Sequence, residues 1–337
     1  MSRALDASPL EQADPAAIAF VIPVRDDAER LRTCLRSLRE VATATPHDVL
    51  VLDHGSVDAS AAVARAAGAR VMTRRGGNVA ALRNLGAAST SAPLIAFIDA
   101  DNEVAAGWLG SALGAFKAPS VGIAGAPYFA PPQGTWVQRT YDALRRHPST
   151  DGPTEWLGAG NMVIRRQAFD AAGGFDERLE TCEDVDLCVR VARAGWDVRA
   201  VPGMKSVHHG DPARLSHVFW GELWRGRDNL RVTLRGPRSF RTLASAAMPV
   251  AYAGAVVASL AGWLAGWPAG AVIAGTGLVG LLALLALRVS TMRRNAGGRL
   301  PAGLWAAVRV ALAYDLGRAA AVFVGVGHGR RREAASK

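Results

Sequence analysis

The feature that most constrains the fold is a run of uncharged residues near the C-terminus. Between Thr242 and Leu287 lie 46 residues with no Asp, Glu, Lys, Arg or His. One membrane-spanning helix needs about 20 apolar residues, so the run can form two, with a turn near residues 267–270. A buried hairpin of a soluble protein is the alternative, but a soluble helix of this length normally has a polar stripe. We therefore expect residues 242–288 to form a two-helix transmembrane hairpin.

The positive charge of the chain lies on both sides of this run. The net charge is +10, but residues 1–204 carry 21 basic and 24 acidic residues, a net of −3. Residues 205–241 hold eight basic and three acidic residues, and residues 288–337 hold ten and two. Basic flanks stay in the cytoplasm and favour anionic lipid. This distribution predicts a multi-pass protein of the cytoplasmic membrane whose N-terminal domain faces the cytoplasm, with an anionic lipid surface as partner and no nucleic acid.

The remaining C-terminal segments are also predicted from their patterns. Residues 213–241 combine tryptophans with arginines, which is typical of a basic amphipathic interfacial helix. Residues 300–327 form a third membrane or interfacial helix, on which Asp315 and Arg318 are spaced to pair, and 328–337 form a basic tail. The GxxxG spacing of Gly262, Gly266 and Gly270 indicates close helix packing, and homo-oligomerisation through the membrane helices is possible.

The N-terminus and the cysteines add two expectations. Residues 1–16 lack the apolar core of a signal peptide, and we expect this segment to be disordered. The chain has three cysteines, which excludes a disulfide framework and favours a reducing compartment.

Residues 17–212 alternate short apolar runs with helical patterns, which predicts an α/β domain with a parallel sheet. The expected strands are 17–23, 48–53, 69–73 and 93–99, and the expected helices are 27–41, 57–67 and 78–89. Ligands of such sheets bind beyond the carboxyl ends of the strands.

Acidic residues stand at three of these strand ends. Asp26, Asp53 and Asp99-Ala100-Asp101 each follow an apolar run. Asp99 and Asp101 can place carboxylate oxygens around Mg²⁺ or Mn²⁺, which would bind substrate phosphates; a polar turn that caps a helix is the alternative. His208 either completes the ligands of this metal or contacts a diphosphate, and a surface histidine pair with His209 is the alternative.

Two further groups carry chemistry. Arg83 could bind two phosphate oxygens at once through its guanidinium, but a position on a solvent-exposed helix face explains an arginine here equally well. Glu183, Asp184 and Asp186 stand in the first turn of an expected helix, where acidic residues suit the helix dipole. Three carboxylates in four positions exceed what capping requires, so one of them is a candidate general base for a hydroxyl nucleophile.

Seven short motifs follow one another along the chain in an order that resembles glycosyltransferase family 2. The motifs are Val21-Ile-Pro-Val-Arg-Asp-Asp, Val51-Leu-Asp-His-Gly-Ser, Ala81-Leu-Arg-Asn-Leu-Gly, Phe97-Ile-Asp-Ala-Asp, Gly158-Ala-Gly-Asn, Gly173-Gly-Phe-Asp-Glu and Glu183-Asp-Val-Asp. The resemblance implies an inverting enzyme with the GT-A fold, a Rossmann-like, mixed but mainly parallel sheet with flanking helices, to which the C-terminal hairpin is added.

The resemblance also implies roles for individual residues. Asp184, or else Glu183, would be the catalytic base, and Asp101, helped by Asp99, would bind the metal. The implied donor-binding residues are Pro23, Val24, Asp26, Asp53, Arg83 and Asp99. The implied acceptor-side residues are Gly158, Gly160 and Asn161.

The implied activity is metal-dependent transfer of one sugar from a nucleotide-sugar, expected to be UDP-linked. Its acceptor would be a membrane lipid or a lipid-linked glycan in cell-surface or exopolysaccharide synthesis. The Q-x-x-R-W motif of processive synthases is absent, which favours a single transfer. The alternative is a non-catalytic membrane scaffold that binds nucleotide-sugar, because His54 stands where the family usually has a second acidic residue.

Overall fold

The computed structural model describes the chain except for residues 1–15, 146–149, 237–239, 266–267 and 325–337. The expected disordered segment 1–16 therefore lies outside the described residues except for Ala16, and the expected basic tail 328–337 lies outside them completely. Gly266, and Trp267 of the expected hairpin turn, are outside them as well.

The alternation predicted for the N-terminal part is confirmed, with element bounds within three residues of the expected ones. In chain order, the elements are β1 (Ile18–Val24), α1 (Ala28–Val41), β2 (His47–Asp53), α2 (Ser60–Ala66), β3 (Arg70–Thr73), α3 (Val79–Ala88) and β4 (Leu94–Ile98). Strands β1, β2, β3 and β4 pair in parallel.

The second half of the domain makes the sheet mixed. Its elements are β5 (Asn102–Val104), α4 (Trp108–Ala115), β6 (Val121–Gly125), α5 (Trp136–Asp142), β7 (Gly152–Pro153), β8 (Asn161–Arg165), α6 (Arg166–Ala172), α7 (Glu183–Arg193), β9 (Asp197–Ala200) and β10 (Ser206–His208). The main sheet has the order β3-β2-β1-β4-β8-β6-β9-β7, and β8 is antiparallel to both β4 and β6. A separate two-stranded sheet pairs β10 with β5.

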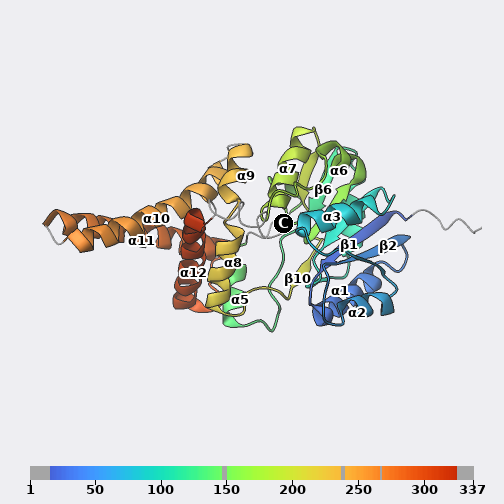
Figure 1. The fold of residues 1–337 in the computed structure, drawn as a ribbon, viewed down its shortest axis with the longest axis horizontal. Coiled ribbons are helices and arrows are strands. Elements are labelled where there is room, and N and C mark those ends of the chain that lie inside the picture. The colour runs from blue at the N-terminus through green and yellow to red at the C-terminus, as the bar shows by residue number, and fades with distance from the viewer. Residues whose placement is uncertain (1–15, 146–149, 237–239, 266–267, 325–337) are drawn as a thin grey trace, which may run out of the picture.

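The sheet separates two hydrophobic cores, and β1 contributes to both. Its residues Ile18, Phe20 and Ile22 pack on the side of α1 and α4, whereas Ala19 and Val21 pack on the side of α3, α6 and α7. Figure 1 shows α1 and α2 on one side of the sheet and α3, α6 and α7 on the other. Because both faces of β1 are covered, its sequence is continuously apolar rather than alternating.

The C-terminal part is helical: α8 (Leu215–Arg225), α9 (Asn229–Arg235), α10 (Phe240–Ala265), α11 (Pro268–Asn295) and α12 (Gly303–Val324). The single helix expected over 213–241 is wrong, because the chain breaks between α8 and α9 at Gly226–Asp228. Figure 1 shows the α10–α11 hairpin projecting away from the sheet, with α5, α8 and α12 between the two.

Two of these helices are long and apolar enough to cross a membrane. The segments Ala247–Leu264 and Gly270–Asn295 have mean hydropathies of 1.5 and 2.3, and only 22% and 11% of their residues are buried. A core helix of a soluble protein would be mostly buried. Length, composition and exposure thus support membrane association.

Close packing of glycines occurs inside the hairpin itself. A Cβ on Gly262 would collide with backbone atoms of Gly270 and Ala274, and one on Gly277 would collide with Ser259. Gly262, the first glycine of the GxxxG spacing, therefore packs closely against α11 of the same chain, and homo-oligomerisation stays a prediction.

The charged residues of α12 do not pair with each other as expected. Asp315 binds Arg288 of α11, with Nη2 and Oδ1 2.6 Å apart. Arg318 binds Glu222 of α8, with Nε and Oε2 2.6 Å apart. Both residues of α12 thus bind partners on neighbouring helices, and these ion pairs replace the expected pair within α12.

Candidate active site

Strand order brings the predicted carboxylates to one edge of the sheet. β1 lies between β2 and β4 and is parallel to both. The carboxyl ends of the three strands are therefore adjacent, and these ends carry Asp26, Asp53 and Asp99. This edge is where a parallel sheet binds its ligand.

Asp99, Asp101 and His208 come together at this edge. One potential ligand atom from each lies within 4.8 Å of the others, and His208 Nε2 is 3.4 Å from Asp101 Oδ1. His208 reaches the cluster because β10 pairs antiparallel with β5, which places it opposite Asn102. Two carboxylates and an imidazole are a donor set that divalent cations such as Mn²⁺ accept.

Two glycines let these carboxylates pack directly against the backbone. A Cβ on Gly160 would collide with Oδ2 of Asp99, and a Cβ on Gly210 would collide with Oδ2 of Asp101. Burial raises the pKa of Asp101, although His208 and Arg30 oppose this effect. The predicted metal residues thus fit a divalent cation in their chemistry and in their closeness to one another.

Arg83 lies behind the cluster and is only 4% exposed. Its Nη2 donates to Asp99 Oδ1 at 2.8 Å and its Nη1 to Glu183 Oε1 at 2.6 Å. The solvated helix face considered for Arg83 is therefore wrong. Arg83 connects α3 to the strand end of β4 and to the start of α7, which leaves Asp99 Oδ2 for a metal.

The three carboxylates at the start of α7 have three different environments. Glu183 is bound by Arg83, and Asp186 is bound by Arg190 Nε at 2.7 Å. Asp184 accepts weakly from the backbone N–H of Ala159 at 3.3 Å and from Val185 at 2.8 Å, and forms no ion pair with another described residue. Burial and the neighbouring Glu183 raise the pKa of Asp184 to about 7, although Arg83 opposes them. Asp184 is therefore the carboxylate suited to take a proton near neutral pH.

The donor-side residues hold the neighbouring strand ends together. Asp53 is 3% exposed and accepts from Ser56 N at 3.0 Å. Asp26 adopts a φ of 51° and accepts from Val57 N at 2.7 Å. Pro23 lies opposite Leu52 in the sheet, and the carbonyl of Val24 accepts from His54 N at 2.8 Å. Nucleotide binding by these residues stays a prediction.

The acceptor-side residues divide into two kinds. Gly160 lies against Asp99, and its N–H donates to the Tyr128 hydroxyl at 3.0 Å. Gly158 packs against the same hydroxyl. Asn161 is fully buried: it donates to Ala126 O and Met204 O and accepts from Trp108 Nε1. The Asn161 side chain therefore connects the segments at Ala126 and Met204 to α4, and its burial keeps it away from a bound acceptor.

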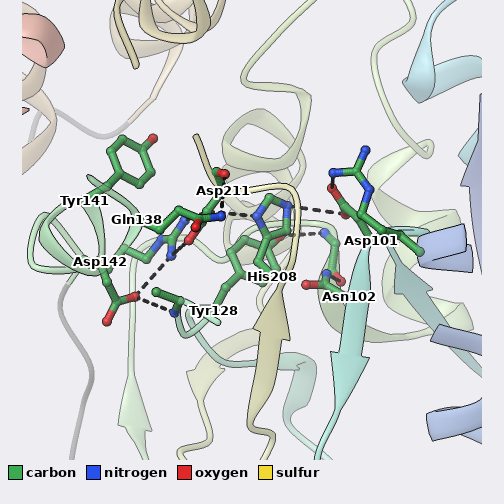
Figure 2. A network of polar contacts seen from close by, with 12 residues as sticks. Asp101, Asn102, Tyr128, Gln138, Tyr141, Asp142, His208 and Asp211 are labelled. Atoms are coloured by element: carbon green, nitrogen blue, oxygen red, sulfur yellow. Dashed lines mark hydrogen bonds and ion pairs between the residues drawn. The ribbon is translucent and has the colours of Figure 1, made fainter. Parts of the chain in front are cut away.

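Sequence reasoning missed several residues around the cluster. Asp211 accepts from His208 Nδ1 at 2.8 Å (Figure 2). Arg145 in turn binds Asp211, with Nη1 2.7 Å from Oδ2. Asp228, between α8 and α9, accepts from the N–H groups of Glu180 and Thr181, just before the candidate base. His208-His-Gly-Asp211 stands in the sequence as a motif, but nothing in its spacing reveals Arg145 as the partner.

Comparison with known proteins agrees with this geometry. Residues 19–172 match the family described as Glycosyl transferase family 2. Over 294 residues, the chain is 30% identical to the pre-mycofactocin glycosyltransferase of Mycobacterium tuberculosis, covering 83% of this chain and 57% of that protein. It is 35% identical over 127 residues to the N-acetylglucosaminyl-diphospho-decaprenol L-rhamnosyltransferase of the same organism, covering 33% of this chain and 41% of that protein. The chain thus spans about half the length of these relatives.

One solved structure is similar over nearly the whole chain. It is the mannosyltransferase PcManGT from Pyrobaculum calidifontis, in complex with GDP-Man and Mn²⁺, with a TM-score of 0.64 and 17% identity. The match covers 96% of this chain and 91% of that one. At this identity the likeness concerns the fold. Together, the ordered motifs and the matched segment show that residues 19–172 are similar to glycosyltransferase family 2, and the sheet topology and the solved neighbour show the GT-A fold.

Proposed function

We propose that the protein transfers one sugar from a nucleoside-diphosphate sugar to an acceptor hydroxyl at the membrane surface, with inversion at the anomeric carbon. The observation that carries this proposal is the position of Asp184 on the same sheet edge as the Asp99–Asp101–His208 cluster, linked to it through Arg83 and Glu183. A base and a cation site on one edge are the two groups that direct displacement at a sugar diphosphate requires.

Each residue has a defined task in this reaction. A divalent cation held by Asp99, Asp101 and His208 would neutralise the diphosphate that leaves. Asp184 accepts the proton of the acceptor hydroxyl, for which its pKa of about 7 is suited. Arg83 keeps Glu183 and Asp99 in place. The missing side chain at Gly160 lets the Asp99 carboxylate and the Tyr128 hydroxyl pack directly against the backbone.

The acceptor is proposed to be lipid-linked. Two apolar helices follow the catalytic domain, and one relative is named for a decaprenol-linked substrate. Basic residues on both sides of the hairpin support a domain that faces the cytoplasm and contacts anionic lipid.

A second acceptor class has its own support. The relative that aligns over 83% of this chain, including part of the helical region, is named for pre-mycofactocin rather than for a lipid. A non-lipid acceptor that is modified at the membrane is therefore the second candidate.

The direct test uses the full chain in membranes with UDP-, GDP- and dTDP-linked sugars. The acceptors are polyprenyl-diphosphate glycans in one arm and soluble acceptors without a lipid in the other. We expect transfer that stops with EDTA and returns with Mn²⁺ or Mg²⁺, and an inverted anomeric centre by NMR. Asp101→Ala and Asp184→Asn should each lose transfer. Nucleotide binding without turnover for every donor and acceptor would instead favour the non-catalytic scaffold.

A further inference from the structure

His208 presents its two ring nitrogens to different partners. Nε2 faces Asp101 at 3.4 Å, and Nδ1 lies 2.8 Å from Asp211 Oδ1 (Figure 2). A histidine that binds a metal through one nitrogen needs its other nitrogen fixed by an acceptor, because this sets the tautomer and the orientation of the ring. Asp211 occupies the position of that acceptor.

The hydrogen between Asp211 and His208 can be assigned to the histidine. Asp211 is 4% exposed, and both of its oxygens accept from the guanidinium of Arg145, with Nη1 2.7 Å from Oδ2. A guanidinium only donates, so a carboxylate that accepts its fork carries no proton towards it. Nδ1 therefore donates to Asp211, and in the neutral ring Nε2 offers its lone pair towards Asp99 and Asp101, where a cation would bind.

Arg145 is itself held in place. Its guanidinium carbon lies 5.7 Å from the ring centroid of Tyr128 and 5.2 Å from that of Tyr141. Gln138 of α5 donates to the backbone carbonyl of Asp211 at 3.0 Å, and the same glutamine completes a capping box with Thr135. The start of α5 and the loop after β10 are thus joined into one rigid support behind His208.

We propose that Asp211 is a positioning residue for the metal site and that Arg145 holds Asp211 in the required orientation. Together they keep Nε2 of His208 directed at the cation held by Asp99 and Asp101, and they set the affinity for that cation. The inference rests on the metal site of the proposed function, but it concerns residues that touch neither the metal nor a substrate.

A purely structural role for the pair makes a different prediction. If Asp211 and Arg145 only fasten α5 to the loop after β10, their loss lowers thermal stability and leaves metal coordination unchanged. Asp315 provides a matched control, because it is 2% exposed, binds the fork of Arg288, and is not part of the metal cluster. Asp211→Ala and Asp315→Ala thus remove equivalent buried ion pairs.

The experiment measures Mn²⁺ alone on the full chain in nanodiscs, with no nucleotide. Free Mn²⁺ is titrated by EPR, and pulsed EPR detects nitrogen bound to the ion. We expect wild-type protein and Asp315→Ala to bind Mn²⁺ with equal affinity and a nitrogen signal. Asp211→Ala should bind about 10–100-fold more weakly, with the nitrogen signal lost.

Conservative variants keep the test decisive if Asp211→Ala does not fold. Asp211→Asn retains an acceptor for Nδ1 and should fall between wild type and Asp211→Ala, whereas Arg145→Lys loses the fork and should weaken Mn²⁺ binding several-fold. Wild-type affinity and an intact nitrogen signal in both variants would overturn the inference.

The same titration separates this inference from the proposed function. Wild-type protein that binds no Mn²⁺ would overturn the metal site as well, whereas Mn²⁺ binding without sugar transfer would overturn only the proposed activity.

Discussion

Arg83 and Glu183, 100 positions apart in the chain, form a buried ion pair with Nη1 and Oε1 2.6 Å apart. This pair favours Asp184 over Glu183 as the proposed base. An arginine always carries its proton and its positive charge, so Glu183 is committed to it as an acceptor. Asp184, the next residue, has no such partner among the described residues and remains available for the reaction.

The first prediction follows from this division. Asp184→Asn should lower kcat by about 10²–10⁴-fold, the usual contribution of a general base, with little change in Mn²⁺ affinity. Glu180→Gln, at an exposed carboxylate of the same loop, is the control and should stay near wild type. Steady-state transfer assays and Mn²⁺ titration measure both effects. Transfer at the wild-type rate by Asp184→Asn would remove this residue from the mechanism.

The second prediction concerns pH. The pKa of Asp184 is raised to about 7, and only the deprotonated carboxylate accepts a proton. Under saturating substrates, kcat should therefore rise with pH through an apparent pKa near 7 and level off above it. A pH–rate profile of the wild-type protein checks this rise. A kcat that is constant between pH 5.5 and 8.5 would contradict the assignment.

The third prediction concerns the Arg83 pair itself. Removal of one partner from a buried ion pair leaves an uncompensated charge and costs about 3–5 kcal/mol. Arg83→Met should therefore lower the thermal unfolding temperature by several degrees. Arg74→Met is the control, because Arg74 is partly exposed and 3.9 Å from Glu177, a pair worth about 1 kcal/mol or less. Equal melting temperatures for the two variants would argue against the importance of the buried pair.

The fourth prediction tests the close contact between Gly160 and the carboxylate of Asp99. A Cβ on Gly160 would collide with Asp99 Oδ2, so Gly160→Ala should displace that carboxylate and weaken Mn²⁺ binding at least tenfold, about 1.4 kcal/mol. Gly110→Ala is the matched control, since it lies in α4 with no atom within 4 Å of the added Cβ. Metal titration of both proteins separates the steric effect from a general effect of alanine. Unchanged Mn²⁺ affinity in Gly160→Ala would count against this geometry.

The fifth prediction concerns the loop before the base. Asp228 Oδ2 accepts from Glu180 N at 2.9 Å and from Thr181 N at 3.2 Å, while Asp228 N donates to Thr181 Oγ1. Asp228→Ala should loosen this loop and reduce kcat about tenfold, the cost of one or two hydrogen bonds, with KM for the donor nearly unchanged. Asp197→Ala, which breaks a hydrogen bond to Ser120 away from the site, should not change kcat. A loss confined to KM would refute a positioning role for Asp228.

The strands and the metal residues could be predicted because their signals are local. A strand buried on both faces must be continuously apolar, and Asp99 and Asp101 follow such a run directly. The order of the motifs along the chain then added Asp184 as the candidate base.

The supporting contacts could not be predicted, because they join residues far apart in the chain. Arg145 and Asp211 are 66 positions apart, and their pairing depends on how α5 packs against the loop after β10. The expected pair of Asp315 with Arg318 failed for the same reason: helix spacing permits it, but tertiary partners on α11 and α8 replace it. The single helix expected over 213–241 overlooked Gly226 and Asp228, between which the chain turns from α8 into α9.

Glu222 has a consequence for the relation between the two halves of the protein. It is fully buried and accepts from Tyr141 of α5, from Arg225 of its own helix and from Arg318 of α12. A fragment that ended before the hairpin would expose the face of α8 that α12 covers and would leave this carboxylate without Arg318. The apolar helices are therefore not a separable attachment, because α5, α8, α11 and α12 contribute to one hydrophobic core.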